Sequence, residues 1–97
     1  MDFKVLIADS AIDDLKEIVE FVAEDDPVAA VRLADKLINQ ALNLATFPER
    51  HPVFDRERNI HKMTVPPYLI FYTCEESARV VNILHIWHGA RRPPDFR

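Results

Sequence analysis

Three apolar segments lie close together in the second half of the chain, at about residues 60–65, 68–74 and 79–88. Only Pro66-Pro67 separates the first two, and only Glu75-Glu76-Ser77 separates the last two. Parallel neighbours would need a crossover connection of a dozen or more residues, so these gaps predict an antiparallel meander. The middle segment is apolar on both faces, which predicts that it is the central strand.

The N-terminal part of the chain predicts one strand followed by a helix. Phe3, Val5 and Ile7 fall on alternate positions, which is typical of a short strand. Ser10 stands three residues before Asp13, an arrangement close to a capping box, and it predicts the start of a helix. Apolar residues then recur at helical spacing up to a predicted end near residues 24–25, namely Ile12, Leu15, Ile18, Val19 and Val22.

A second helix is predicted to begin at Asp26-Pro27, because aspartate accepts hydrogen bonds from free helix amides and proline loses nothing at the first helical position. Phe47-Pro48 is expected to end it, since the residue before a proline is disfavoured in the helical region. A polar loop over residues 49–58 should follow. The apolar stripe of this helix comprises Ala30, Leu33, Ala34, Leu37, Ala41 and Leu44.

These elements predict an α+β fold in the order β-α-α-β-β-β, as a single domain over residues 1–97. A hairpin of two helices should pack on one face of a mainly antiparallel sheet of about four strands, leaving the other face free. The side chains expected to be largely buried are Leu15, Ile18, Val22, Leu33, Leu37, Leu44, Ile70 and Ile83.

Composition narrows the classes of function. No apolar run reaches the roughly 18 residues that a membrane span needs, and the first residues lack the pattern of a secretory signal. The single cysteine, Cys74, cannot form an internal disulfide, so a cytoplasmic, reducing location is the expectation. A net charge of −4 argues against a general nucleic-acid binder.

The charge is nevertheless distributed unevenly. Up to Glu49 the chain has four Lys/Arg against eleven Asp/Glu, whereas from Arg50 onward it has eight against five, together with all four histidines. This division would let the chain offer an acidic helical face to one partner and a basic face to another. The alternative is that the helices simply carry solvated carboxylates.

The richest stretch of chemistry is the end of the last predicted strand, His85-Ile86-Trp87-His88-Gly89-Ala90-Arg91-Arg92. Arginines bind phosphates or carboxylates, histidine moves protons near neutral pH, and Trp87 could offer a stacking face. Lys62 alternates with its neighbours on the adjoining meander and is expected on the open face of the sheet. The residues predict an anion site, against the alternative of a solvated strand end with Trp87 in the core.

Other candidate groups are weaker. His85 and His88 are three residues apart on a strand and should point to opposite faces, so no metal site is expected, and no cofactor motif is present. Cys74 is expected to be a buried small residue rather than a nucleophile. Tyr68 and Tyr72 should share one face with Ile70, and tyrosines in this position are more often part of a core edge than catalytic groups.

Taken in order along the chain, the local patterns resemble the RelE/ParE superfamily of toxins, of the plasmid stabilisation type. The first helix carries Ala11-Ile12-Asp13-Asp14-Leu15-Lys16-Glu17-Ile18, similar to the family's A-x-x-D-L-x-x-I pattern. The other matching segments are Pro27-Val28-Ala29-Ala30, Leu44-Ala45-Thr46-Phe47-Pro48, Tyr68-Leu69-Ile70-Phe71-Tyr72 and His88-Gly89-Ala90-Arg91, the last resembling the ParE-like H-G-x-R pattern. His85 departs from the family, because many relatives have arginine there.

The resemblance implies the toxin component of a type II toxin–antitoxin system, neutralised by a cognate antitoxin and contacting operator DNA only through that antitoxin. The ParE-like patterns and the acidic balance favour a gyrase inhibitor that is not an enzyme. The alternatives are an endoribonuclease that cuts messenger RNA on the ribosome, with His88, Arg91 and Lys62 as catalytic residues, and a homologue that only binds antitoxin. The residues expected to contact the partner or the target are Lys62, Tyr68, Tyr72, His85, Trp87, His88, Arg91 and Arg92.

Overall fold

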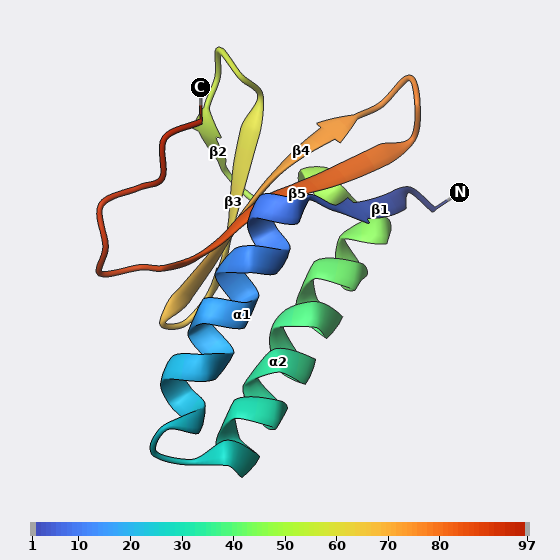
Figure 1. The fold of residues 1–97 in the computed structure, drawn as a ribbon. Helices are drawn as coiled ribbons and strands as arrows, with labels where there is room; N and C mark the ends of the chain where they lie inside the picture. Colours follow the sequence, from blue (N-terminus) through green and yellow to red (C-terminus); the bar gives the residue numbers. More distant parts are fainter. Residues whose placement is uncertain (1, 97) are drawn as a thin grey trace.

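The computed structural model describes residues 2–96, which form a five-stranded sheet and a helical hairpin (Figure 1). The order β-α-α-β-β-β is confirmed, with one additional short strand. The elements are β1 (Lys4–Ile7), α1 (Asp9–Ala23), α2 (Pro27–Leu42), two 3-10 turns (Asn43–Ala45 and Pro48–Arg50), β2 (Val53–Asp55), β3 (Ile60–Val65), β4 (Tyr68–Glu75) and β5 (Val80–His88).

The sheet has the strand order β1-β5-β4-β3-β2. β3, β4 and β5 form the predicted antiparallel meander with β4 in the middle, while β1 pairs with β5 in parallel. The expectation of about four strands was wrong by one, because β2 lies in the segment predicted to be a loop. β2 has only three residues, and its pairing with β3 depends on a partner that local sequence does not specify.

The first helix begins differently from the prediction. α1 starts at Asp9, and its N-cap residue, Ala8, makes no side-chain cap. Ser10 therefore lies inside the helix, where its hydroxyl donates to the carbonyl of Leu84 on β5 at 2.7 Å. The capping-box prediction was wrong because a partner 74 residues away engages this hydroxyl.

The second helix begins as predicted and ends earlier than expected. The Asp26 side chain accepts a hydrogen bond from the Ala29 amide at 3.1 Å, and Pro27 occupies the first helical position. Regular helix ends at Leu42, and the chain tightens into a 3-10 turn before Phe47. Phe47 then adopts a left-handed backbone conformation, with φ 47° and ψ 57°.

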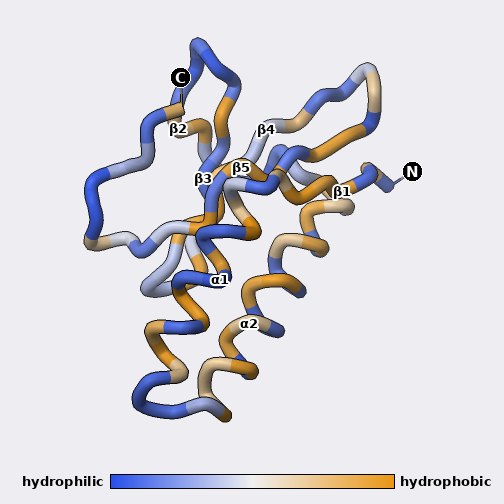
Figure 2. Tube along the Cα trace, viewed as in Figure 1, coloured by the Kyte–Doolittle hydropathy of each residue, from blue (hydrophilic) through white to orange (hydrophobic). Residues whose placement is uncertain are grey.

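The core lies between the helical hairpin and one face of the sheet. Of the eight side chains predicted to be buried, Leu37, Leu44, Ile70 and Ile83 are fully buried. The other four, Leu15, Ile18, Val22 and Leu33, are only partly buried. Leu15, Ile18 and Leu33 pack against this core from its rim. The turn between α1 and α2 extends beyond the sheet (Figure 1), and this turn is hydrophilic (Figure 2).

Tyr72 belongs to this core and lies at its β3 side, against two histidine rings. The His61 ring stacks on the Tyr72 ring at 5.2 Å between centroids, and the His51 ring meets it edge-on at 6.4 Å. The Tyr72 hydroxyl donates to the Pro48 carbonyl, and His61 Nδ1 donates to the His51 carbonyl at 2.9 Å. These contacts fix the connection after α2 to the sheet.

Within residues 2–96, no helix combines the length and the apolar character that crossing a membrane requires.

Candidate functional site

A groove of about 390 Å³ lies between α1 and the end of the sheet where β4 begins and β5 ends. One wall is a stripe of α1 residues at helical spacing, which places them on one face of the helix. The other wall comes from β4, β5 and the segment after β5. The lining residues are Asp14, Glu17, Ile18, Phe21, Val22, Tyr68, Ile86, His88 and Arg91.

His88 and Tyr68 meet at the floor of this groove, because the antiparallel register of β4 and β5 pairs them directly. Their rings are edge-to-face with centroids 5.4 Å apart. His88 Nδ1 accepts a hydrogen bond from the Ala90 amide at 3.1 Å, so Nε2 carries the proton of the neutral ring. Tyr68 is 9% exposed, so only a small part of its surface is accessible in the groove.

Gly89 permits the sharp turn that carries the chain from His88 to Arg91. Its amide donates to the Pro67 carbonyl at 2.8 Å, and a Cβ at this position would lie 3.0 Å from the same oxygen. The Arg91 guanidinium then lies over the Trp87 ring at 4.2 Å, in a cation–π contact. The H-G-A-R segment thus places one imidazole and one guanidinium at the same groove.

The outer edge of β5 is closed by two side chains of α1. β1 pairs with β5 only as far as Ile83, so the edge beyond it has no strand partner. Ser10 donates to the Leu84 carbonyl at 2.7 Å, and Asp14 Oδ2 accepts from the Ile86 amide at 3.1 Å. The register of β4 and β5 shifts at Leu84, so these two contacts also hold an irregularity of the strand in place.

The opposite face of the sheet holds a second set of the predicted site residues. Lys62, His85 and Trp87 lie there, because their partners on β4 are Phe71 and Leu69, which point away from the helices. The Lys62 ammonium lies 5.7 Å from the centre of the Phe54 ring. The Phe96 ring of the tail contacts the rings of Phe54, Phe71 and His85.

The structure therefore divides the eight predicted contact residues. Tyr68, His88 and Arg91 line the groove, whereas Lys62 and His85 belong to the opposite face. Trp87 links the two regions, since Arg91 lies over its ring and its indole nitrogen donates to the Arg92 carbonyl at 2.8 Å. The Arg92 side chain is exposed in the tail.

Tyr72 belongs to neither region. It is 0% exposed, so it offers no atom to a partner in this conformation. Burial raises the pKa of its phenol well above the usual range, which keeps the hydroxyl protonated as a donor to Pro48. Tyr72 is thus a core residue, unlike Tyr68.

The sequence reasoning missed the contribution of α1 to the groove. Asp14, Glu17 and Phe21 line it, and Phe21 is 73% exposed. The available signal was Phe21 itself, a large apolar side chain on the helix that was left out of the predicted core stripe. Within residues 2–96, no group of three or more His, Cys, Asp or Glu side chains could hold a metal ion. Burial raises the pKa of the Cys74 thiol, which disfavours the thiolate that a nucleophile needs.

Known proteins resemble this chain over most of its length. The family model described as "ParE toxin of type II toxin-antitoxin system, parDE" matches residues 5–93. Toxin RelE2 of Caulobacter vibrioides is 35% identical over 81 residues, which cover 84% of this chain and 89% of that protein.

Two solved structures share the fold. One, from the chromosomal ParDE TA system of P. aeruginosa, has a TM-score of 0.75 at 16% identity and covers 89% of this chain and 95% of its own. The other, from the toxin–antitoxin complex RelBE2 of Mycobacterium tuberculosis, has a TM-score of 0.70 at 19% identity and covers 91% of this chain and 99% of its own. At these identities the likeness concerns the fold alone.

Proposed function

Since the chain belongs to the ParE toxin family of type II toxin–antitoxin systems, we propose that it acts by binding DNA gyrase rather than by cutting RNA. A cognate antitoxin holds it inactive. The protein is then a binding toxin, whose effect depends on surface complementarity and not on a set of catalytic groups.

One observation carries this proposal: Lys62 and His88 lie on opposite faces of the sheet. Lys62 pairs with Phe71, whereas His88 pairs with Tyr68, and these two β4 residues point in opposite directions. A ribonuclease needs a base, an acid and a cation around one phosphate. The predicted trio of Lys62, His88 and Arg91 does not gather around a single point, which favours binding over catalysis.

The groove suits a segment of the antitoxin. It combines the exposed apolar ring of Phe21 with Arg91, which can anchor a carboxylate. A disordered acidic segment that carries one apolar side chain would order on binding and cover both. The two solved structures named above come from systems described as toxin–antitoxin pairs, which agrees with such a partner.

The ribonuclease alternative keeps one specific observation in its favour. Tyr68, His88 and Arg91 do line the same groove, and the neutral His88 ring has a defined tautomer. These three residues offer a proton carrier and a charge stabiliser without Lys62. A ribonuclease of this type would lose about 10²-fold or more of its activity in His88→Ala, as general acid–base groups typically contribute about 10²–10⁴.

Two assays of the purified protein separate the functions. One measures supercoiling by DNA gyrase, and the other measures cleavage of messenger RNA on translating ribosomes. We expect inhibition of supercoiling, with His88→Ala reducing it only partly because binding energy is spread over several residues. Ribosome-dependent cleavage with gyrase unaffected would reverse the proposal, and inactivity in both assays would favour a homologue that only binds antitoxin.

A further inference from the structure

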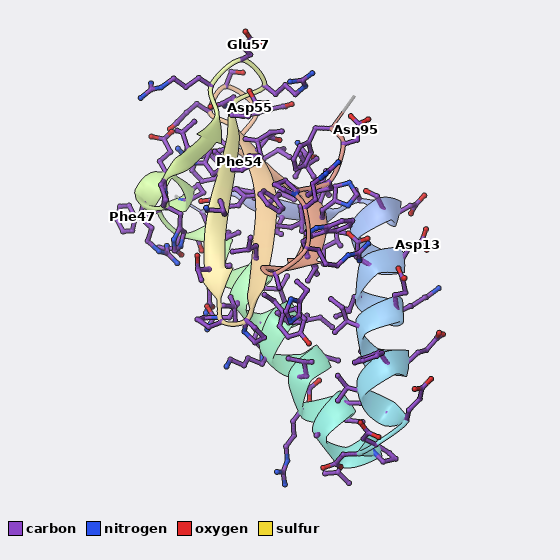
Figure 3. All side chains as sticks on the ribbon, turned by 90° about the vertical axis from the view of Figure 1, so that its left-hand side faces the viewer. Asp13, Phe47, Phe54, Asp55, Glu57 and Asp95 are labelled. Carbon is purple, nitrogen blue, oxygen red and sulfur yellow. The ribbon has the colours of Figure 1, made fainter. Side chains whose placement is uncertain are left out.

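Phe47 combines two unfavourable features. Its side chain is 78% exposed, and its backbone has φ 47° and ψ 57°. The left-handed region is uncommon for residues other than glycine and asparagine, and it is costly for a bulky side chain. The ring projects away from the ribbon, as Figure 3 shows. The fold itself gains little from an aromatic ring at this position, so the ring calls for an explanation outside the isolated chain.

The segment that carries Phe47 is firmly supported. The Arg50 guanidinium donates to the carbonyls of Thr46 and Phe47, the latter at 3.2 Å. On one side the Ala45 carbonyl accepts from the Phe3 amide at 2.8 Å. On the other side Pro48 is fully buried and its carbonyl accepts from Tyr72. The backbone of Phe47 is therefore held in place, which limits the directions that the ring can take and lowers the entropic cost of binding.

A hollow of about 370 Å³ lies beside Phe47. Its floor includes Phe3, over whose ring the Arg79 guanidinium lies at 4.2 Å. Three carboxylate side chains also line it, those of Asp2, Glu49 and Glu76. The surface thus consists of one projecting aromatic ring and an adjacent recess with mainly acidic groups.

We infer that Phe47 and this hollow form the contact surface for the toxin's protein target, an inference that rests on the proposed function of a toxin that acts by binding. The matching target surface has an apolar pocket for the ring and a basic side chain that enters the hollow. Aromatic side chains seated in pockets supply much of the energy of protein interfaces. Phosphate groups of a nucleic acid would be repelled by the three carboxylates, so the partner is a protein.

The Phe47 surface is separate from the antitoxin groove. The groove includes Tyr68, the first residue of β4, whereas the hollow includes Glu76, directly after its last residue. Eight residues of strand separate the two sites by roughly 25 Å. Their charged groups also differ: the groove has two carboxylates together with His88 and Arg91, whereas the hollow has three carboxylates together with Arg79. A standard protein interface covers about 800 Å² on each partner. Two proteins bound at sites this close would overlap, so a bound antitoxin would block a target that contacts Phe47.

The decisive variant is Phe47→Gly, because glycine removes the ring and relieves the backbone at the same time. We expect a Tm no lower than that of the wild type, because glycine accepts a positive φ without strain, which offsets the entropy that it adds to the unfolded chain. We expect the affinity for the co-expressed antitoxin to stay within about threefold. Growth arrest on induction without antitoxin should be lost, or should need at least tenfold more toxin, as expected for a lost contact worth tenfold or more in affinity.

Val31→Ala is the matched control, because Val31 is also exposed, at 61%, and lies on α2 outside both surfaces. It should leave growth arrest unchanged. Charge reversal in Glu76→Lys should weaken the arrest without changing antitoxin affinity. If Phe47→Gly arrests growth like the wild type, or loses antitoxin binding, the inference is wrong, and a wild-type protein without any toxicity also overturns it. The growth assay tests the Phe47 surface without assuming that the target is gyrase. Growth arrest without inhibition of supercoiling would refute the gyrase proposal, and the result for Phe47→Gly would still decide whether the Phe47 surface contacts the target.

Discussion

Asp14 on α1 binds two neighbouring groups of β5 through one oxygen. Its Oδ2 accepts from the Ile86 amide at 3.1 Å and lies 2.7 Å from His85 Nδ1. The carboxylate thus accepts a hydrogen bond at the edge of β5 that has no strand partner. It also orients the imidazole of His85, which lies on the face of the sheet away from the helices. Because Asp14 also lines the groove, the same residue joins the packing of α1 to the shape of the candidate binding site.

Replacement of Asp14 by alanine should lower the free energy of unfolding by about 1–3 kcal/mol, because the Ile86 amide loses its acceptor and His85 its partner. Urea denaturation measures this change. Asp13→Ala is the control, since Asp13 is exposed and points away from the sheet (Figure 3), and its effect should stay within about 0.5 kcal/mol. Equal losses in the two variants would mean that the contact with β5 contributes nothing.

Gly89→Ala should destabilise the turn after β5. The added Cβ would lie 3.0 Å from the Pro67 carbonyl oxygen, a backbone atom that cannot move without breaking the 2.8 Å hydrogen bond to Gly89. Overpacking of this kind costs about 1–3 kcal/mol. We expect a matching loss of stability in denaturation and weaker antitoxin binding, since the position of Arg91 depends on this turn. Wild-type stability would show that the turn adapts freely.

Stability should fall on acidification because of His51. Burial lowers the pKa of His51 below 6.5, and Arg50 and His61 nearby lower it further. The unfolded chain therefore takes up the proton first, so the contribution of His51 is fully present above pH 6.5 and is lost as the pH falls from there toward the folded pKa. Thermal melts between about pH 8 and pH 5 measure the loss. In His51→Gln the loss of stability on acidification should be smaller. A pH profile equal to that of the wild type would contradict the role of His51.

Phe21 should matter for antitoxin binding and not for folding. Its ring is 73% exposed in the groove, so Phe21→Ser should change the free energy of unfolding by no more than about 0.5 kcal/mol. Loss of an aromatic anchor should weaken the complex about 10- to 100-fold, which calorimetry with the purified antitoxin can measure. An unaffected affinity would place the antitoxin elsewhere.

Tyr72→Phe tests whether Tyr72 is structural. The change leaves the Pro48 carbonyl without its donor, and an unsatisfied buried acceptor costs about 1–3 kcal/mol. Affinity for antitoxin should not change, because Tyr72 has no exposed surface. A selective loss of binding with full stability would return Tyr72 to the contact residues.

Local sequence determined the elements and much of their order. Alternation and short gaps located β3, β4 and β5 and their antiparallel pairing, because these features depend on residues that are close in the chain. Asp26-Pro27 likewise marked the start of α2 correctly, since the cap bond reaches only three residues, to Ala29. The same period of two placed His85 and His88 on opposite faces of β5.

Tertiary structure decided the rest. The short strand β2 exists because β3 lies beside it, and Ser10 caps a carbonyl of β5 instead of its own helix. Asp14 and Phe21 line the groove because α1 crosses the free end of β5. Asp14 and its β5 partner His85 are 71 residues apart in the chain. Hydrogen-bonding side chains take whichever partner packing brings within reach, and that choice is set by contacts distant in sequence, so periodicity alone could not reveal it.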